Sequence, residues 1–273
     1  MLGLALIISA ATLTADQAPA GSEIVQIKSR TQTLRALLWQ PSGAGPFPVV
    51  LFNHGSAGAA DAISVKDAST LGPVFARHGY IFLFLFRQGI GLSAREGTAD
   101  GVLMDRALKK GGQEAKSRVQ LQLLDAESED GFAALTFLRA LPKADDHRVA
   151  LIGHSFGGSI TLAMAARDPG VLAAVVFGAA AASWGPSPPL RERLLKAIGR
   201  VPAPVFFIHA ANDYSTAPGK ALAAEMQRLG KPNRLKIYPA FGATQREGHN
   251  LVYRSVATWE SDVFAFLDPL LKR

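Results

Sequence analysis

Residues 149–158, Val-Ala-Leu-Ile-Gly-His-Ser-Phe-Gly-Gly, carry the most information about the fold of this chain. The first four of them form a short apolar run typical of a strand that is buried on both faces. Gly153, Ser155 and Gly157 match the pattern G-x-S-x-G, and the apolar run 159–166 that follows is compatible with a helix. Strand, sharp turn and helix form the context in which this pattern presents a nucleophilic serine. The glycines fit such a turn, because a side chain there would collide with neighbouring backbone.

A serine hydroxyl is a weak nucleophile unless a base removes its proton, and this elbow requires the chain order serine, acid, histidine. His249 follows the last expected strand, which is where the base is delivered, so we predict that it is the base. The acid is expected after the strand at 205–208, and Asp213 lies there. Asp213 would fix the imidazole tautomer and stabilise the imidazolium. An Asx turn or a helix N-cap before Pro218 is the alternative role for Asp213.

The other five histidines are expected to be structural. His78 falls at a helix end and His147 at the start of a strand. His154 lies inside the elbow and is expected to point away from the nucleophile. His209 lies near the end of a strand, and His54 lies in a loop that it is expected to support by hydrogen bonding.

A tetrahedral oxyanion needs two backbone donors. We predict that one is the N–H of Phe156, which directly follows the nucleophile at the start of a helix. The other should come from the loop after the third strand, residues 53–58. The N–H of Ser56 is the first choice there and that of Gly55 the second.

Apolar runs alternate with helix-compatible stretches along the chain. The runs are expected to be strands, at 24–28, 34–39, 49–52, 80–86, 149–152, 173–177, 205–208 and 235–238. Helices are expected at about 67–78, 115–140, 156–167, 217–229 and 256–271. This alternation predicts a doubly wound α/β domain with a mostly parallel central sheet flanked by helices.

Two segments interrupt the alternation. Residues 88–114 hold many glycines and charged residues, and residues 183–200 begin with Ser-Trp-Gly-Pro and continue into a short helix. Long connections of this kind often form lids or binding loops over a site, and plain surface loops are the alternative.

Composition limits the kinds of function. The chain has 273 residues, 48% of them hydrophobic and 19% charged, which suits one large folded domain. It contains no cysteine, which excludes a cysteine nucleophile, disulfides and thiolate metal sites. The formal charge is +7, but Lys and Arg are scattered, so we expect no nucleic-acid partner.

The N-terminus resembles a secretory signal. Residues 2–13 are apolar, and Ala-Pro-Ala at 18–20 resembles a cleavage site, although no Lys or Arg precedes the apolar stretch. We therefore expect a signal peptide at 1–20, a single domain at 21–273, export to the periplasm or outside the cell, and no stable membrane insertion after processing. A lipid-facing anchor or a frayed apolar terminus is the alternative for this stretch, and a cytoplasmic location is the alternative to export.

Taken together, these motifs resemble the dienelactone-hydrolase-like branch of the α/β-hydrolase superfamily over about residues 30–270. The segments that carry the resemblance are 53–56, 86–93, 153–158, 212–213, 248–249 and 259–267. The resemblance implies the α/β-hydrolase fold and a triad of Ser155, Asp213 and His249. Dienelactone hydrolases proper use a cysteine nucleophile, so a serine points to ordinary carboxylic esters. Related peptidases carry a large extra domain, and its absence from this sequence disfavours oligopeptides.

The sequence thus predicts a carboxylic ester hydrolase that forms an acyl-enzyme on Ser155, with no metal and no organic cofactor. The expected partner is a small-molecule ester, and the oligomeric state is left open. The same residues would also serve an amidase, an acyltransferase or a cofactor-free haloperoxidase. A non-catalytic binding domain of the same fold is the alternative from another class.

Overall fold

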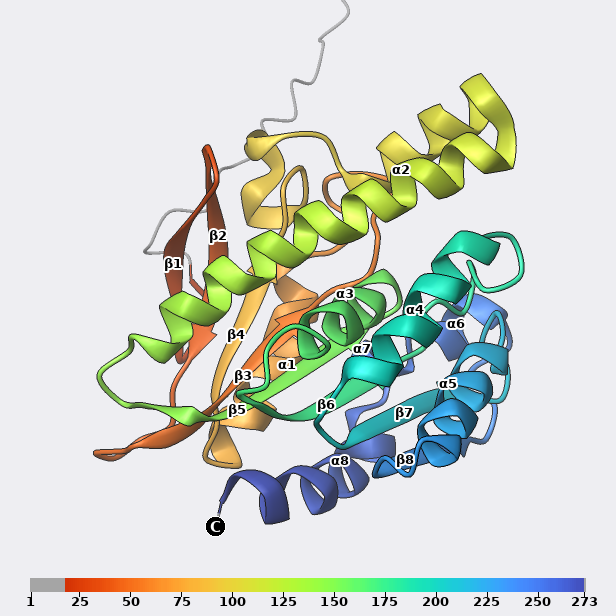
Figure 1. Cartoon of the computed structure of the whole chain (residues 1–273). Coiled ribbons are helices and arrows are strands. Elements are labelled where there is room, and N and C mark those ends of the chain that lie inside the picture. The colour runs from red at the N-terminus through yellow and green to blue at the C-terminus, as the bar shows by residue number, and fades with distance from the viewer. Residues whose placement is uncertain (1–17, 273) are drawn as a thin grey trace, which may run out of the picture.

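The computed structural model describes residues 18–272, which form an eight-stranded sheet with helices on both faces (Figure 1). The strands lie in the order β1-β2-β4-β3-β5-β6-β7-β8. Their bounds are β1 Ser22–Ser29, β2 Gln32–Trp39, β3 Phe47–Asn53, β4 Ile81–Phe86, β5 Ala144–His154, β6 Val171–Phe177, β7 Val205–Ala210 and β8 Asn233–Tyr238.

The sheet is antiparallel at one edge and parallel elsewhere. β1 pairs with β2, and β2 with β4, in antiparallel register, whereas every pair from β4 through β8 is parallel. The carboxyl ends of β3, β5, β6 and β7 therefore lie at one edge, and the connections that leave them meet there. In open α/β sheets this edge is where ligands bind.

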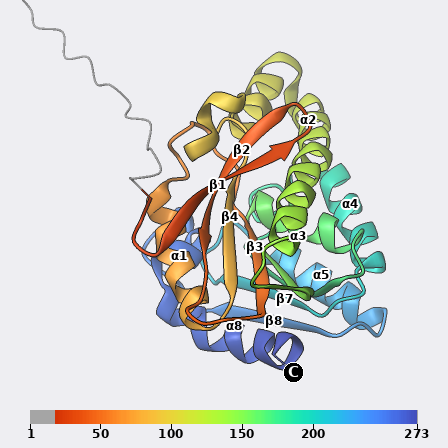
Figure 2. The same ribbon diagram turned by 90° about the vertical axis from the view of Figure 1, so that its left-hand side faces the viewer.

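Two helical layers cover the sheet, and Figure 2 shows them on its opposite sides. α2 to α5 pack on one face, and α1, α7 and α8 pack on the other. The helix bounds are α1 Val65–Arg77, η2 Gly91–Glu96, α2 Asp100–Arg139, α3 Phe156–Ala165, α4 Pro188–Arg200, α5 Ala217–Arg228, α6 Gln245–His249, α7 Leu251–Arg254 and α8 Val256–Leu271.

The apolar strand runs explain the two layers. In β3, Val49 and Leu51 join the core under α2 to α5, whereas Val50 and Phe52 join the core under α1, α7 and α8. This alternation follows from the two-residue period of a strand, and both faces are apolar because both are covered. The predicted α/β architecture with a mostly parallel sheet is confirmed.

The prediction for residues 88–114 was wrong in part. Instead of one long loop, the segment forms η2 and then the first turns of α2, which begins at Asp100. α2 bends sharply at Gly111 and Gly112, and Gly112 has a φ of 68°. Glycines are expected to break a helix, but this pair instead forms the bend between two helical arms of α2. Residues 183–200 contain the expected helix, α4.

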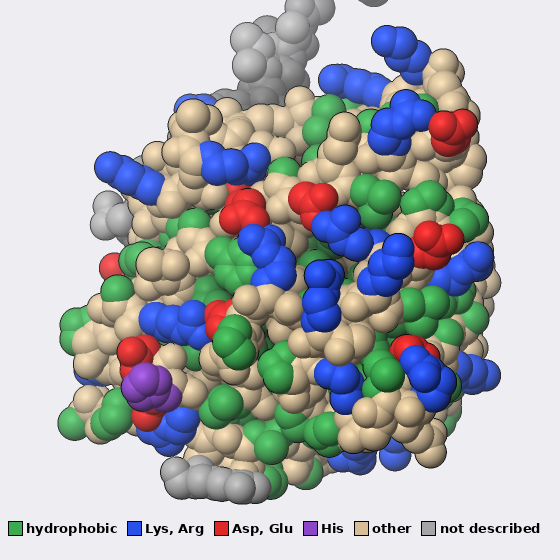
Figure 3. Space-filling view, viewed as in Figure 1, with side chains coloured by type: hydrophobic (Ala, Val, Ile, Leu, Met, Phe, Trp, Pro, Cys, Tyr) green, Lys and Arg blue, Asp and Glu red, His purple; other side chains and the backbone are tan. Residues whose placement is uncertain are grey.

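The expected apolar signal stretch lies almost wholly at residues 1–17, outside the described residues. Among residues 18–272, no helix has the length and apolar character needed to cross a membrane. On the face shown in Figure 3, Lys and Arg side chains are spread among acidic and apolar ones over α2 and α4.

Candidate active site

Ser155 lies at a strained turn between β5 and α3. Its φ is 55° and its ψ is −120°, and its N–H donates to the Phe177 carbonyl at 2.8 Å. A Cβ atom added at Gly157 would lie 2.0 Å from the Asn53 carbonyl oxygen, and one at Gly153 would lie 2.3 Å from the Gly157 oxygen. Both positions must therefore be glycine, as the motif predicted. A positive φ at a non-glycine residue is a form of strain found at functional sites.

His249 follows β8, as predicted, and is the last residue of α6, a short helix. Thr244 caps this helix: its hydroxyl accepts the Glu247 N–H, and the Glu247 carboxylate accepts the Thr244 N–H. The His249 Nδ1–H donates to Asp213 Oδ1 at 2.6 Å. With the proton on Nδ1, the Nε2 atom is left as the acceptor that a general base needs.

Ser155, Asp213 and His249 converge on the region of Gly178, directly after β6. The neighbouring Phe177 carbonyl holds the Ser155 N–H. A Cβ atom at Gly178, whose φ is +57°, would lie 2.9 Å from Asp213 Oδ2 and 3.0 Å from His249 Nδ1. The structure thus brings all three predicted triad residues to the carboxyl edge of the sheet.

Asp213 holds two histidines rather than one. Its Oδ2 accepts the Nδ1–H of His209 at 2.8 Å, and its Oδ1 also accepts the Tyr214 N–H at 2.7 Å. Burial works to raise the pKa of Asp213, but the hydrogen bonds from His209 and His249 outweigh it, and the pKa is lowered. Asp213 is therefore ionised. The sequence places His209 near a strand end but does not predict its contact with Asp213, which lies four residues later.

His154 packs against His249 and hydrogen-bonds to its backbone. Its ring packs 4.7 Å from the His249 ring, between centroids, and its Nε2–H donates to the His249 carbonyl at 2.9 Å. Burial and the nearby His249 lower the pKa of His154 to about 3, so its imidazole stays neutral. Its ring lies against the rings of His249 and Tyr253, and its contact with His249 was not predicted.

The two predicted oxyanion donors are placed differently. Phe156 is the first residue of α3, so its N–H has no acceptor within the helix. Ser56 is exposed in the loop after β3, and its N–H has no acceptor among the described residues. The neighbouring Gly55 approaches the nucleophile, since a Cβ atom added there would lie 3.1 Å from Ser155 Cβ. Burial raises the pKa of the Tyr253 phenol, and the Gly55 N–H works to lower it. Neither the Gly55 N–H nor the Ser56 N–H has an acceptor among the described residues, so Ser56 stays the first choice and Gly55 the second, as predictions.

Of the remaining histidines, His54 and His78 make structural contacts, as predicted, whereas His147 is exposed. His78 stacks on Phe264 and binds Glu260 at 2.8 Å, and His147 lies at the surface. His54 donates from Nδ1 to the Gly55 carbonyl at 2.7 Å and accepts the Arg87 N–H on Nε2. Within residues 18–272, no three His, Asp or Glu side chains are grouped as a metal site.

The family follows from a match to known proteins. A model of the dienelactone hydrolase family matches residues 34–270, which is most of the chain. The chain belongs to the dienelactone hydrolase family. The recognised resemblance is thereby confirmed, and the family supports a hydrolase of the α/β-hydrolase fold.

Individual relatives of this dienelactone hydrolase family member are distant. A polyketide transferase, grgF, from Penicillium sp is 29% identical over 220 residues, which are 75% of this chain and 65% of that protein. An acylaminoacyl peptidase of Pyrococcus horikoshii superposes with a TM-score of 0.67 at 18% identity, over 92% of this chain and 42% of the peptidase. A dienelactone hydrolase of Anabaena variabilis superposes with a TM-score of 0.61 at 20% identity, over 90% of this chain and 97% of that hydrolase. This chain thus spans less than two thirds of the transferase and of the peptidase.

Within the proposed triad, the acid side of the pH dependence should reflect one proton. Asp213 has a lowered pKa and stays ionised as the pH falls, and His54 and His154 have lowered pKa values and stay neutral. Protonation of the base alone should then remove activity, so log(kcat/KM) should fall with unit slope on the acid side. Rates of ester hydrolysis from about pH 4 to 9 would measure it. A slope of two, or no fall at all, would contradict this account.

Proposed function

We propose that this protein is a serine hydrolase of carboxylic esters, with Ser155 as nucleophile, His249 as base and Asp213 as the acid that orients it. The observation that carries the proposal is the short hydrogen bond from His249 Nδ1 to the buried Asp213 carboxylate, beside a serine held at a positive φ. A buried ionised carboxylate that fixes an imidazole tautomer next to a serine is the arrangement that acyl transfer requires.

The reaction then proceeds in two halves. Ser155 Oγ attacks the ester carbonyl carbon while His249 Nε2 takes the hydroxyl proton, and the carbonyl electron pair moves onto oxygen. Collapse of this intermediate breaks the bond to the alcohol, which leaves with the proton from His249. Water then attacks the carbonyl carbon of the acyl-enzyme while His249 Nε2 takes one of its protons. The second tetrahedral intermediate collapses and breaks its bond to Ser155 Oγ. This step releases the acid, and His249 returns its proton to the Ser155 oxygen.

The N–H groups of Phe156 and Ser56 would bind the oxyanion in both halves. They suit this role because neither has another acceptor among the described residues. Donors that are fixed before the reaction stabilise developing charge without reorganisation. No step of this chemistry calls for a metal or an organic cofactor.

Acyl transfer to an acceptor other than water is the second candidate. It is favoured by the sequence similarity to a polyketide transferase, which shares 29% identity over 220 residues. An acyl-enzyme on Ser155 is common to both reactions, so the acceptor decides between them. Product analysis with an aryl ester in water, with and without an added alcohol or thiol, separates the two. Hydrolysis should dominate; transfer that exceeds hydrolysis at millimolar acceptor would favour the transferase.

The size of the acyl group that the site accepts is a testable property of the proposed esterase. The segment after β6 and the first arm of α2 are packed rather than free, since Trp184 and Met104 are buried in the core under α2 to α5 and Ser183 accepts a hydrogen bond from Gln120. Such packed segments favour a pocket of limited volume. We therefore expect kcat/KM to be highest for short or medium acyl chains, or small aromatic acids.

A series of p-nitrophenyl esters of increasing acyl length measures this preference. The value of kcat/KM should decline well before about twelve acyl carbons, because a pocket of fixed shape accepts no further methylenes. A continued rise beyond that length, together with activation at an oil–water interface, would mean that the protein is a lipase.

A further inference from the structure

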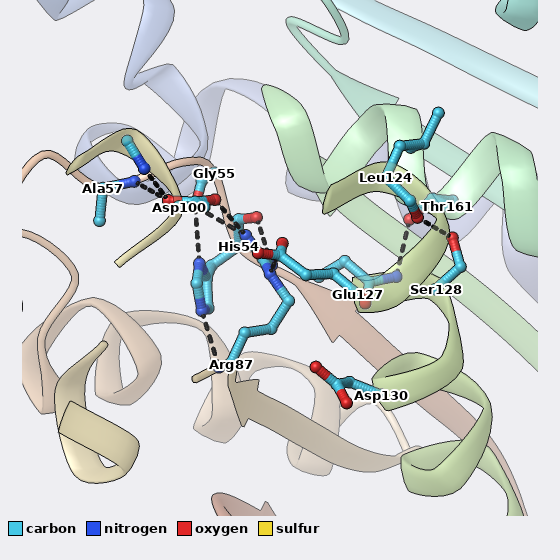
Figure 4. A network of polar contacts seen from close by, with 12 residues as sticks. His54, Gly55, Ala57, Arg87, Asp100, Leu124, Glu127, Ser128, Asp130 and Thr161 are labelled. Atoms are coloured by element: carbon cyan, nitrogen blue, oxygen red, sulfur yellow. Dashed lines mark hydrogen bonds and ion pairs between the residues drawn. The ribbon is translucent and has the colours of Figure 1, made fainter. Parts of the chain in front are cut away.

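Arg87 directly follows β4 and is completely buried, although it carries a charge. Figure 4 shows it between His54, Glu127 and the Asp100 carboxylate. Its Nε donates to Glu127 Oε2 at 2.5 Å, and its Nη2 lies 3.3 Å from Asp100 Oδ2. A buried guanidinium is costly unless its donors are satisfied and its charge is paired. Arg87 can therefore stay buried only while Glu127 and Asp100 pair its charge and its donors are hydrogen-bonded.

The remaining Arg87 donors bind the backbone of the loop after β3. Nη1 donates to the His54 carbonyl at 2.8 Å, and Nη2 donates to the Gly55 carbonyl at 3.0 Å. In a trans peptide the N–H points opposite to the preceding carbonyl. With these two carbonyls turned toward Arg87, the N–H groups of Gly55 and Ser56 must point away from it.

Asp100, the first residue of α2, fixes the next peptide of the same loop. Its Oδ1 accepts the Ala57 N–H at 2.7 Å, while its Oδ2 faces Arg87. The N–H of Gly101 donates to the Ala57 carbonyl at 3.0 Å, and a Cβ atom at Gly101 would lie 2.5 Å from that oxygen. The start of α2 thus holds the far side of the loop at close range.

The charges of this network are mutually dependent. Burial works to lower the pKa of Arg87, but Glu127 and Asp100 outweigh it and raise the pKa, so the guanidinium stays charged. Burial raises the pKa of Glu127 to about 8 against the attraction of Arg87. Asp100 accepts from three donors: its Oδ1 accepts the N–H groups of Ala57 and Gly101, and its Oδ2 accepts Arg87 Nη2. Burial raises the pKa of Asp100 against the attraction of Arg87 and these hydrogen bonds.

We infer that Arg87 and Asp100 are positioning residues that orient residues 54–57 so that the Ser56 N–H faces the oxyanion formed on Ser155. This inference rests on the proposed function. Neither side chain touches the substrate; each acts through the backbone of the loop. The inference explains why a charged network is buried behind this loop, where apolar packing would suffice for stability alone.

Asp100→Asn is the variant that tests the inference, with Arg87→Met as a second. An amide at position 100 must turn its NH₂ toward either Arg87 or the Ala57 N–H, so one contact becomes repulsive. Arg139→Met is the matched control, because Arg139 forms a part-exposed ion pair with Asp168 at 2.8 Å and contacts none of the residues of the loop.

Kinetics with p-nitrophenyl butyrate should show kcat reduced by about 10²-fold in Asp100→Asn, the range expected for loss of one oxyanion donor, with KM within about twofold. Affinity for a trifluoromethyl ketone, which forms an oxyanion on the serine, should fall by a similar factor. Affinity for the matching methyl ketone should not change. A merely structural role would not separate these two ketones.

Hydrogen exchange at the Ala57 amide gives a readout that does not depend on activity. It should become at least about tenfold faster in Asp100→Asn and stay unchanged in Arg139→Met. If folded Asp100→Asn keeps its kcat, its ketone discrimination and its Ala57 protection, the inference is overturned even if Arg87→Met does not fold. A wild-type protein that fails to react with a fluorophosphonate would overturn the proposed function itself, whereas a reactive protein with indifferent variants overturns only this inference.

Discussion

Ser155→Ala should lower kcat for ester hydrolysis by about 10⁶-fold, because no acyl-enzyme can form without the hydroxyl. The fold should persist, since the Ser155 N–H, which binds the Phe177 carbonyl, is retained and the hydroxyl holds no other element in place. Steady-state kinetics with an aryl ester, alongside thermal unfolding, would measure both effects.

Ser159→Ala is the matched control for this prediction. Ser159 lies one helical turn further along α3, is completely buried, and its Oγ has no hydrogen-bond partner among the described residues. Its loss should leave kcat close to the wild-type value. If Ser155→Ala retained activity while folded, another nucleophile would have to be sought.

His249→Ala should be about as damaging as loss of the nucleophile, because triad members act as a unit and removal of one removes the benefit of the others. Asp213→Asn should reduce kcat by a smaller but still large factor. The loss should be smaller because the new NH₂ group can donate to His209 Nδ1, while the remaining side-chain oxygen still accepts the His249 Nδ1–H. Kinetics with the same ester would rank the two variants.

His147→Ala serves as the control for both, because His147 is exposed at the start of β5. Its kcat should match that of the wild-type protein. A neutral effect of Asp213→Asn, and likewise of Asp213→Ala, would mean that a different carboxylate orients His249.

The strands of the sheet could be predicted from sequence because burial on both faces leaves continuous apolar runs. The run at 49–52 became β3, Phe47–Asn53, and the run at 205–208 became β7, Val205–Ala210. The elbow at Ser155 could also be predicted, since its glycines are required by local backbone contacts within a few residues of one another.

The start of α2 could not be predicted, because Gly111 and Gly112 interrupt its helical pattern with the signal of a loop. The contact of His209 with Asp213 has a weak local signal in their four-residue spacing, but a strand end gives no sign of where its side chain points. Arg87 and Asp100 are brought to residues 54–57 only by the fold, since the loop, the end of β4 and the start of α2 are separated in sequence. Contacts of this kind have no signature in a single sequence.

The role of Ser155 as the nucleophile is tested by the intact mass of the protein after reaction with a fluorophosphonate, followed by peptide mapping. One adduct per chain is expected, located on Ser155, and none in Ser155→Ala. The adduct should form far more slowly in His249→Ala, because the base is needed to activate the hydroxyl. No adduct on the wild-type protein, or an adduct on a residue other than Ser155, would contradict the account.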